Sequence, residues 1–305
     1  MEKRKMGLMA ALGSYVLWGL LPIYWKALGE VSAYEILAHR IIWSFVFMVL
    51  LLWGMKKLQT FRQECAVLWQ DKRRVALLLA AAVLITMNWG IYIWAVMNKH
   101  VVDTSVGYYM NPLVSVFLGV LVFQERLSGM KWAAIALACC GILGMTWELG
   151  RLPFVAVGVA STFAMYGAVK KKLQFNPLYS ITLETLIILP FFLAYVLYLQ
   201  QGGEGHLGTA DWTVTTLLVV AGAVTAIPLV LFSIGANNLP LNVLGFCQYV
   251  SPSITLILGL SLFGESFSRA QLIAFSFIWT ALVIFTIADW RERKFLERQE
   301  KTQNG

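Results

Sequence analysis

The chain has 305 residues, of which 59% are hydrophobic and only 13% are charged, and its mean hydropathy is +0.71. Soluble globular chains carry about a quarter of charged residues, so this composition excludes an ordinary soluble protein. The net charge of +8 comes from residues in short loops and at the ends, without a basic groove interleaved with aromatics, and we therefore exclude nucleic acid as a partner.

Apolar segments long enough to cross a bilayer recur along almost the whole length. The first of them continues past Trp18 and Pro22 without a small-residue cleavage site, so we expect a retained helix rather than a signal peptide. The basic segment 55–74 has apolar residues at helical spacing, which fits a short helix on the membrane surface as well as a solvated loop. The predicted fold class is an all-α integral membrane protein with ten transmembrane helices, at 7–27, 36–54, 75–97, 102–123, 129–147, 152–170, 178–199, 212–234, 241–263 and 269–289.

The lysines and arginines predict the orientation of these spans. If the N-terminus is cytoplasmic, nineteen of the 24 lie in cytoplasmic segments and four in outer ones, with Arg40 inside a span. This asymmetry fits the positive-inside rule, so both termini are predicted to be cytoplasmic.

An internal repeat relates the two halves of the chain. A shift of 140 residues places Tyr109 on Tyr249 and Pro112 on Pro252. We therefore predict a first five-helix repeat at 1–150, a second at 151–290 and a basic cytoplasmic tail at 291–305. Five is an odd number, so the second repeat enters the membrane from the opposite face. Inverted repeats of this kind can exchange conformations, which favours alternating access with a site near the midplane.

Prolines and polar residues within the spans are the candidates for a pathway. Pro112 and Pro252 each free a backbone carbonyl near the middle of repeat-equivalent helices, although each could also be a packing kink. Asn88 lies near the centre of the third span, where it either bonds to another helix or faces a ligand. The predicted substrate-binding or pathway residues are Trp18, Asn88, Trp89, Tyr92, Tyr108, Tyr109, Asn111, Gln248, Tyr249 and Ser251.

Three ionisable residues lie just inside span ends: His39, Arg40 and Glu184. Charges within spans are costly and mark ion or substrate routes, so we assign these three to a gate or to proton coupling. Glu184 is the best candidate for a proton-linked carboxylate. A snorkelling side chain or a gate-side salt bridge is the alternative explanation.

Motifs for catalysis are absent from the sequence. We find no phosphate-binding GxxxxGK[ST] loop, zinc motif or nucleophile elbow, so we expect neither an enzyme nor transport driven by this chain's own ATP hydrolysis. The four cysteines have no metal or disulfide spacing, and we expect neither a metal nor a cofactor.

Several stretches resemble one known family, the RarD permeases of the EamA branch of the drug/metabolite transporter superfamily. The resemblance implies ten helices in two inverted EamA repeats, a bacterial inner-membrane location and secondary transport, commonly export of metabolites or drugs. It also implies a cavity formed by helices 1, 3, 4, 6, 8 and 9, and the family carries a label connecting it with chloramphenicol. The residues that carry the resemblance are 39–44, 88–89, 93–96, 105–113, 184–186 and 245–249.

A secondary transporter for small organic solutes is therefore the function that we expect, with the lipid bilayer and a coupling proton as further partners. A flippase for a lipid-linked substrate and a channel-like or signalling membrane protein are the alternatives. Substrate, transport direction, coupling ion and oligomeric state do not follow from the residues.

Overall fold

The computed structural model describes residues 2–29, 31–97, 101–149, 154–208, 211–262 and 269–303, and this part of the chain is helical apart from short connections. The helices are α1 (Glu2–Lys26), α2 (Ala33–Gly54), α3 (Leu58–Gln70), α4 (Lys72–Met97), α5 (Val101–Phe123), α6 (Gly129–Leu149), α7 (Phe154–Leu173), α8 (Pro177–Gln201), α9 (Trp212–Asn238), α10 (Leu241–Cys247), α11 (Val250–Ser261) and α12 (Arg269–Gln303).

Eight helical segments of the described chain are long and apolar enough to cross a membrane: α1, α2, α4, α5, α8, α9, α12 and the combined segment Leu241–Ser261. Helix α6 adds a shorter apolar stretch at Gly129–Gly144, and α7 has 20 residues with three lysines in its last turn. Helices satisfy their own backbone hydrogen bonds, which the bilayer core requires. The all-helical membrane class is confirmed, and the structure is compatible with the ten predicted spans.

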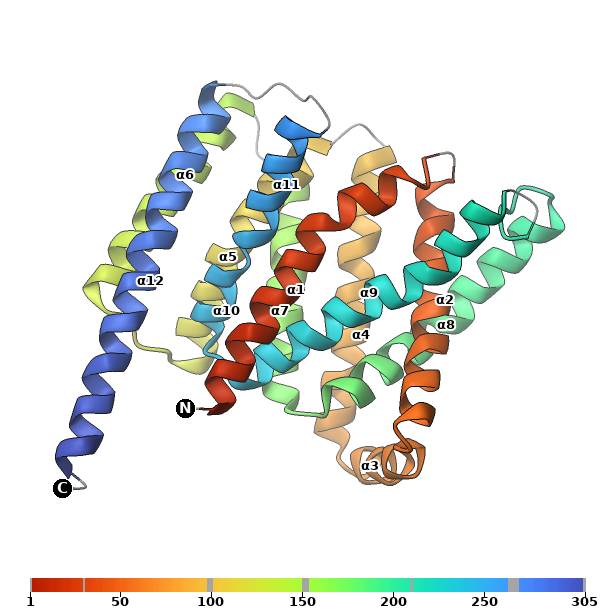
Figure 1. Cartoon of the computed structure of the whole chain (residues 1–305), viewed down its shortest axis with the longest axis horizontal. Helices are drawn as coiled ribbons and strands as arrows, with labels where there is room; N and C mark the ends of the chain where they lie inside the picture. The colour runs from red at the N-terminus through yellow and green to blue at the C-terminus, as the bar shows by residue number, and fades with distance from the viewer. Residues whose placement is uncertain are drawn as a thin grey trace.

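The two halves of the chain interlock rather than lie apart. Helix α1 packs along α9 and α11, and α7 packs in the same way along α4 and α5. The first helix of each half thus contacts the third and fourth spans of the other half, as two inverted five-helix repeats require. Helices α6 and α12 form a separate pair at one edge of the molecule (Figure 1).

One close crossing joins α2 to α9 across the two halves. A Cβ atom added to Gly222 would lie 2.1 Å from the carbonyl carbon of Trp43, so only glycine fits at this position. The hydroxyl of Ser44 donates to the carbonyl of Gly222 at 2.9 Å and fixes the crossing. Small residues allow this kind of close backbone approach between membrane helices.

The ninth span differs from the single helix predicted at 241–263. Helix α10 ends at Cys247 and α11 begins at Val250, with Gln248 and Tyr249 between them. Pro252 has no N–H to donate, so it cannot contribute the usual bond toward Gln248, and the helix is interrupted one turn before it. The apolar segment Leu241–Ser261 matches the predicted span, with a local interruption at Gln248 and Tyr249, and residue 263 lies outside the described residues.

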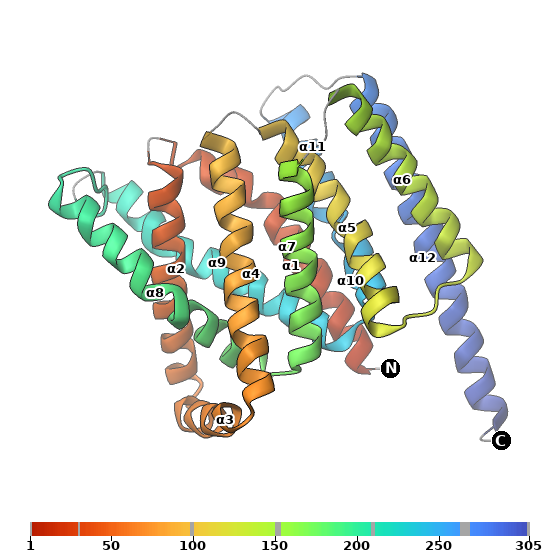
Figure 2. The same cartoon turned by 180° about the vertical axis from the view of Figure 1, so that it is seen from behind.

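Helix α3 and both ends of the chain lie at the same end of the bundle (Figures 1 and 2). The segment 55–74 contains helix α3, so it is not only a solvated loop. Leu68 is its buried anchor and packs in a cluster with Leu52, Leu78 and Tyr179. We refer below to this end of the molecule as the terminal end and to the other as the distal end.

Candidate functional site

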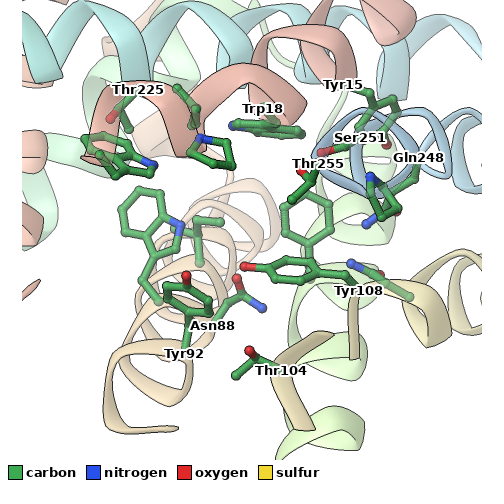
Figure 3. A pocket seen from close by; sticks show the side chains of 18 of the residues that line it. Tyr15, Trp18, Asn88, Tyr92, Thr104, Tyr108, Thr225, Gln248, Ser251 and Thr255 are labelled. Atoms are coloured by element: carbon green, nitrogen blue, oxygen red, sulfur yellow. The ribbon is translucent and has the colours of Figure 1, made fainter. Parts of the chain in front are cut away.

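A cavity of about 440 Å³ lies between the two halves of the bundle. It is lined by side chains from α1, α2, α4, α5, α7, α9, α11 and the α10–α11 break, and Figure 3 shows several of them pointing into one space. Cavities of roughly 300–1,000 Å³ with aromatic walls and a few polar groups are typical of small-molecule sites. Nine of the ten predicted pathway residues line it: Trp18, Asn88, Trp89, Tyr92, Tyr108, Tyr109, Asn111, Gln248 and Ser251.

Helix α1 forms one wall through residues on a single helical face. Tyr15, Trp18, Pro22 and Trp25 follow one another at spacings of three or four residues, which places them above each other on a helix. The Trp18 ring packs at 5.6 Å from Tyr15 and at 5.8 Å from Phe232 of α9. This wall is therefore a fixed aromatic surface.

Helices α4 and α5 form the opposite wall. The amide nitrogen of Asn88 donates to the carbonyl of Val159 at 2.8 Å and to the hydroxyl of Thr162 at 3.0 Å, both on α7. Asn88 thus joins helices of the two halves and also lines the cavity. Tyr92 and Tyr108, with ring centroids 6.1 Å apart, are 37% and 39% exposed toward the hollow.

The α10–α11 break supplies polar groups to the third side. Gln248 lies in the break, and Ser251 and Thr255 follow on the same face of α11. Figure 3 shows Gln248, Ser251 and Thr255 beside one another, facing the Asn88 and Tyr108 side. The interrupted helix places these polar side chains in the interior, where irregular backbone is tolerated because it is surrounded by protein.

Arg40 of α2 lines the cavity, and its surroundings hold it in place. Its Nε donates to the hydroxyl of Thr225 at 3.0 Å, and its guanidinium carbon lies 4.8 Å from the ring centroid of Trp25 and 5.3 Å from that of Trp89. The head group of Arg40 is thus bound to the neighbouring helix α9.

The other predicted gate residues lie away from the cavity. Glu184 is 3% exposed and accepts from Lys170 at 2.6 Å, Ser180 at 2.6 Å and Tyr166 at 2.9 Å. His39 is 1% exposed, and its Nε2 lies 3.7 Å from a carboxylate oxygen of Glu35. Neither residue is part of the lining.

Tyr249 also lies off the cavity, unlike its repeat partner Tyr109. Its side chain is fully buried and its ring packs 5.7 Å from that of Phe246. The prediction treated the two tyrosines alike because the repeat aligns them.

Sequence reasoning missed other lining residues, among them Tyr15, Trp25, Phe163 and Thr225. The helical spacing of Tyr15 and Trp25 with Trp18 was a usable signal for that face.

A charged network around Glu125 joins the two halves of the chain near the terminal end. Its Oε1 accepts from the backbone N–H of Leu241 at 2.6 Å, and its Oε2 accepts from that of Asn242 at 2.9 Å. Glu125 thereby caps the start of α10, where a carboxylate is stabilised by the helix dipole. Lys171 lies 3.5 Å from the same carboxylate and donates to the carbonyl of Leu239 at 2.5 Å.

Among the described residues, no group of three or more His, Cys, Asp or Glu side chains could hold a metal ion.

The comparison with known proteins decides the family. The profile of the EamA-like transporter family matches this chain twice, over residues 5–147 and 152–287. The chain belongs to the EamA-like transporter family. It is therefore a multi-pass inner-membrane transporter of the drug/metabolite type, and membership indicates transport rather than an enzymatic reaction.

Relatives and a solved structure agree with this assignment. The chain is 41% identical to an "Uncharacterized transporter" of Vibrio cholerae over 286 residues, covering 94% of this chain and 93% of the relative. It is 38% identical to "Protein RarD" of Escherichia coli, covering 94% and 95% of the two chains. A solved crystal structure with 16% identity superposes with a TM-score of 0.70 over 94% of this chain and 98% of the other, which supports the fold alone.

Proposed function

We propose that this EamA transporter is a secondary transporter that carries small organic solutes by alternating access, with export as its physiological direction. The halves 1–150 and 151–290 are the two units that move. Export is proposed from the family resemblance, whereas the mechanism is supported by the form of the cavity.

The observation that carries the proposal is that the cavity is one-sided. Trp25 and Tyr92 lie near the ends of α1 and α4, and Ala33 and Thr104 lie near the starts of α2 and α5, all at the distal end. At the other end of the lining, Tyr15 is 1% exposed and its hydroxyl donates to the carbonyl of Leu244 at 3.3 Å. A site that reaches one face and is sealed from the other is what alternating access requires.

The seal joins the two halves, so its opening would be a movement between them. Glu125 of the first half caps α10 of the second half, and Lys171 of α7 joins the same carboxylate. Ala11 lies one turn nearer the N-terminus than Tyr15, is fully buried, and packs against Gly235 of α9. With the termini cytoplasmic, as the charge distribution predicts, the conformation described is outward-facing.

We propose Glu184 as the group that couples transport to protons. The carboxylate of Glu184 can exchange a proton. It also joins α8 to α7 by accepting hydrogen bonds from Lys170 and Tyr166, so a change in its charge would alter the packing of these two helices. His39 and Arg40 are proposed to act at the distal gate.

A disulfide across the seal tests alternating access. In a background without the four native cysteines, we would introduce Ala11→Cys and Gly235→Cys. A Cβ atom on Gly235 would lie 3.0 Å from that of Ala11, slightly inside the usual disulfide separation of about 3.5–4.5 Å, so a small shift allows the bond. Solute flux into and out of proteoliposomes would be measured across a metabolite and antibiotic panel, with and without a pH gradient.

We expect oxidation to abolish flux and reduction to restore it, whereas the two single-cysteine variants should be insensitive to oxidation. A channel would keep conducting when one movement is locked, so flux through the crosslinked protein would contradict the proposal. A flippase for lipid-linked substrates would show no flux of soluble solutes across the panel, and that result would also contradict it.

A further inference from the structure

Arg40 is the only charged side chain among the described residues that line the cavity. The rest of the lining consists of aromatic and aliphatic side chains with neutral amides and hydroxyls, and it includes no Asp or Glu. Among the described lining residues, a solute in this cavity therefore meets one positive charge and no negative charge.

The positive charge of Arg40 is not neutralised by the described protein groups around it. No described ion pair includes Arg40. The carboxylate of Glu35, five residues earlier on α2, is bound instead to His206, which donates its backbone N–H at 2.7 Å and has its Nδ1 at 2.8 Å. Arg40 is partly buried on the wall of the cavity, so water hydrates its charge only in part, and a partner that arrives with the solute would complete that solvation.

The guanidinium of Arg40 is also positioned to bind. A guanidinium has five N–H donors in a planar fork, and in the described part of the chain Arg40 uses one of them, its Nε–H, to bind the hydroxyl of Thr225. The rings of Trp25 and Trp89 lie within cation–π distance and restrict its orientation. A fixed arginine fork with unused donors matches the two oxygens of a carboxylate.

We infer that the cavity selects organic anions: a single carboxylate binds Arg40, and an aromatic or apolar body packs against the walls formed by Trp18, Tyr92 and Tyr108. This inference rests on the proposed function only in taking the cavity to be the solute site. It predicts that neutral analogues of the same shape bind more weakly and that organic cations are rejected.

The test compares three ligands that differ only in their polar group. The affinities of 3-phenylpropanoate, 3-phenylpropanamide and 3-phenylpropylamine would be measured by calorimetry on the full-length chain in detergent. A charge-assisted hydrogen bond contributes about 1.5–3 kcal/mol, so the anion should bind about 10- to 100-fold more tightly than the amide. The amine should bind most weakly of the three.

Variants then assign the preference to Arg40. Arg40→Gln should remove most of the difference between anion and amide, and Arg40→Lys should retain part of it because the charge stays but the fork is lost. Arg73→Gln is the matched control, since Arg73 is exposed near the terminal end, and it should leave all three affinities unchanged.

The ligand series on the unmodified protein tests the preference for anions even if Arg40→Gln does not fold. Equal or tighter binding of the amide or the amine, or no binding of the anion, would overturn the inference, as would an anion preference that survives in folded Arg40→Gln. Binding at equilibrium needs no transport. Flux of neutral solutes without anion binding would therefore contradict this inference but not the proposed function. Anion binding without flux would contradict the proposed function but not this inference.

Discussion

Glu184 and Lys170 show at the residue scale what a buried charge requires in a membrane protein. Both side chains are at most 4% exposed, their charged atoms are 2.6 Å apart, and Ser180 bonds to both of them. Such a pair is tolerated because each member satisfies the other, and removing one partner leaves the second charge buried and unpaired.

Glu184→Gln should therefore lower the stability of the protein by about 3–5 kcal/mol, the usual cost of breaking a buried ion pair. Adding Lys170→Met should recover most of that loss, because the unpaired cation is removed. Thermal unfolding in detergent measures both effects. A single variant as stable as the unmodified chain, or a double variant no better than the single, would show that the pair is not the source of the stability.

The proton-coupling role of Glu184 makes a separate prediction about transport. Flux through the Glu184→Gln/Lys170→Met variant should lose its dependence on a pH gradient, because the exchangeable carboxylate is gone, while flux at symmetric pH persists. The measurement is proteoliposome flux at several imposed gradients. An unchanged response to the gradient would remove Glu184 from the coupling mechanism.

At the scale of elements, the crossing of α2 and α9 depends on one glycine. Gly222→Ala would place a methyl group 2.1 Å from backbone atoms of Trp43, so the two helices would have to separate. Overpacking of this kind costs about 1–3 kcal/mol, and the bond from Ser44 to Gly222 would weaken as well. We expect a clear fall in the thermal unfolding midpoint.

Gly90→Ala in α4 is the matched control for this crossing. No atom lies within 4 Å of a Cβ added there, and alanine is about 1 kcal/mol more favourable than glycine within a helix. This variant should be as stable as the unmodified chain or more so. If Gly222→Ala melts at the same temperature as Gly90→Ala, the close crossing does not contribute to stability.

The elements also show which features could be predicted from sequence. Hydropathy and charge asymmetry locate long spans well, because about 20 apolar residues are needed to cross a bilayer wherever they occur. They did not predict the break between Cys247 and Val250, since hydropathy measures how apolar a segment is and not where its backbone leaves the helix. They also give no sign that the ammonium group of Lys170, the last residue of the predicted span 152–170, is buried beside Glu184. Hydropathy records side-chain type and not the partner that neutralises it.

The candidate site was predictable where chemistry distinguishes one helix face from another. Asn88 and Gln248 stand out as amides in apolar helices, and both line the cavity. Tyr249 could not be separated from Tyr109 by the repeat, because the alignment matches residue types and does not show that Tyr249 lies in the break between α10 and α11. The bond of Arg40 to Thr225 joins residues 185 positions apart, and no local pattern predicts it.

For the whole molecule, the orientation in the membrane remains a prediction from charge. The N-terminus, the C-terminus and α3 share the terminal end of the bundle, where most of the basic residues lie (Figure 1). In a background without native cysteines, Gln63→Cys on α3 should resist a membrane-impermeant maleimide applied to intact cells. Glu204→Cys, after α8 at the distal end, should react. Labelling with the opposite pattern would invert the assigned topology.

If one cavity is exposed alternately to the two faces of the membrane, the protein should show counterflow. Proteoliposomes loaded with an unlabelled transported solute are diluted into buffer that contains a trace of the labelled solute, and internal label is followed with time. A carrier that exchanges solute through one cavity accumulates label transiently above equilibrium, and this overshoot is the result that we predict. A rise to equilibrium without an overshoot, at a rate unaffected by the internal solute, would indicate a continuous pore and contradict the account.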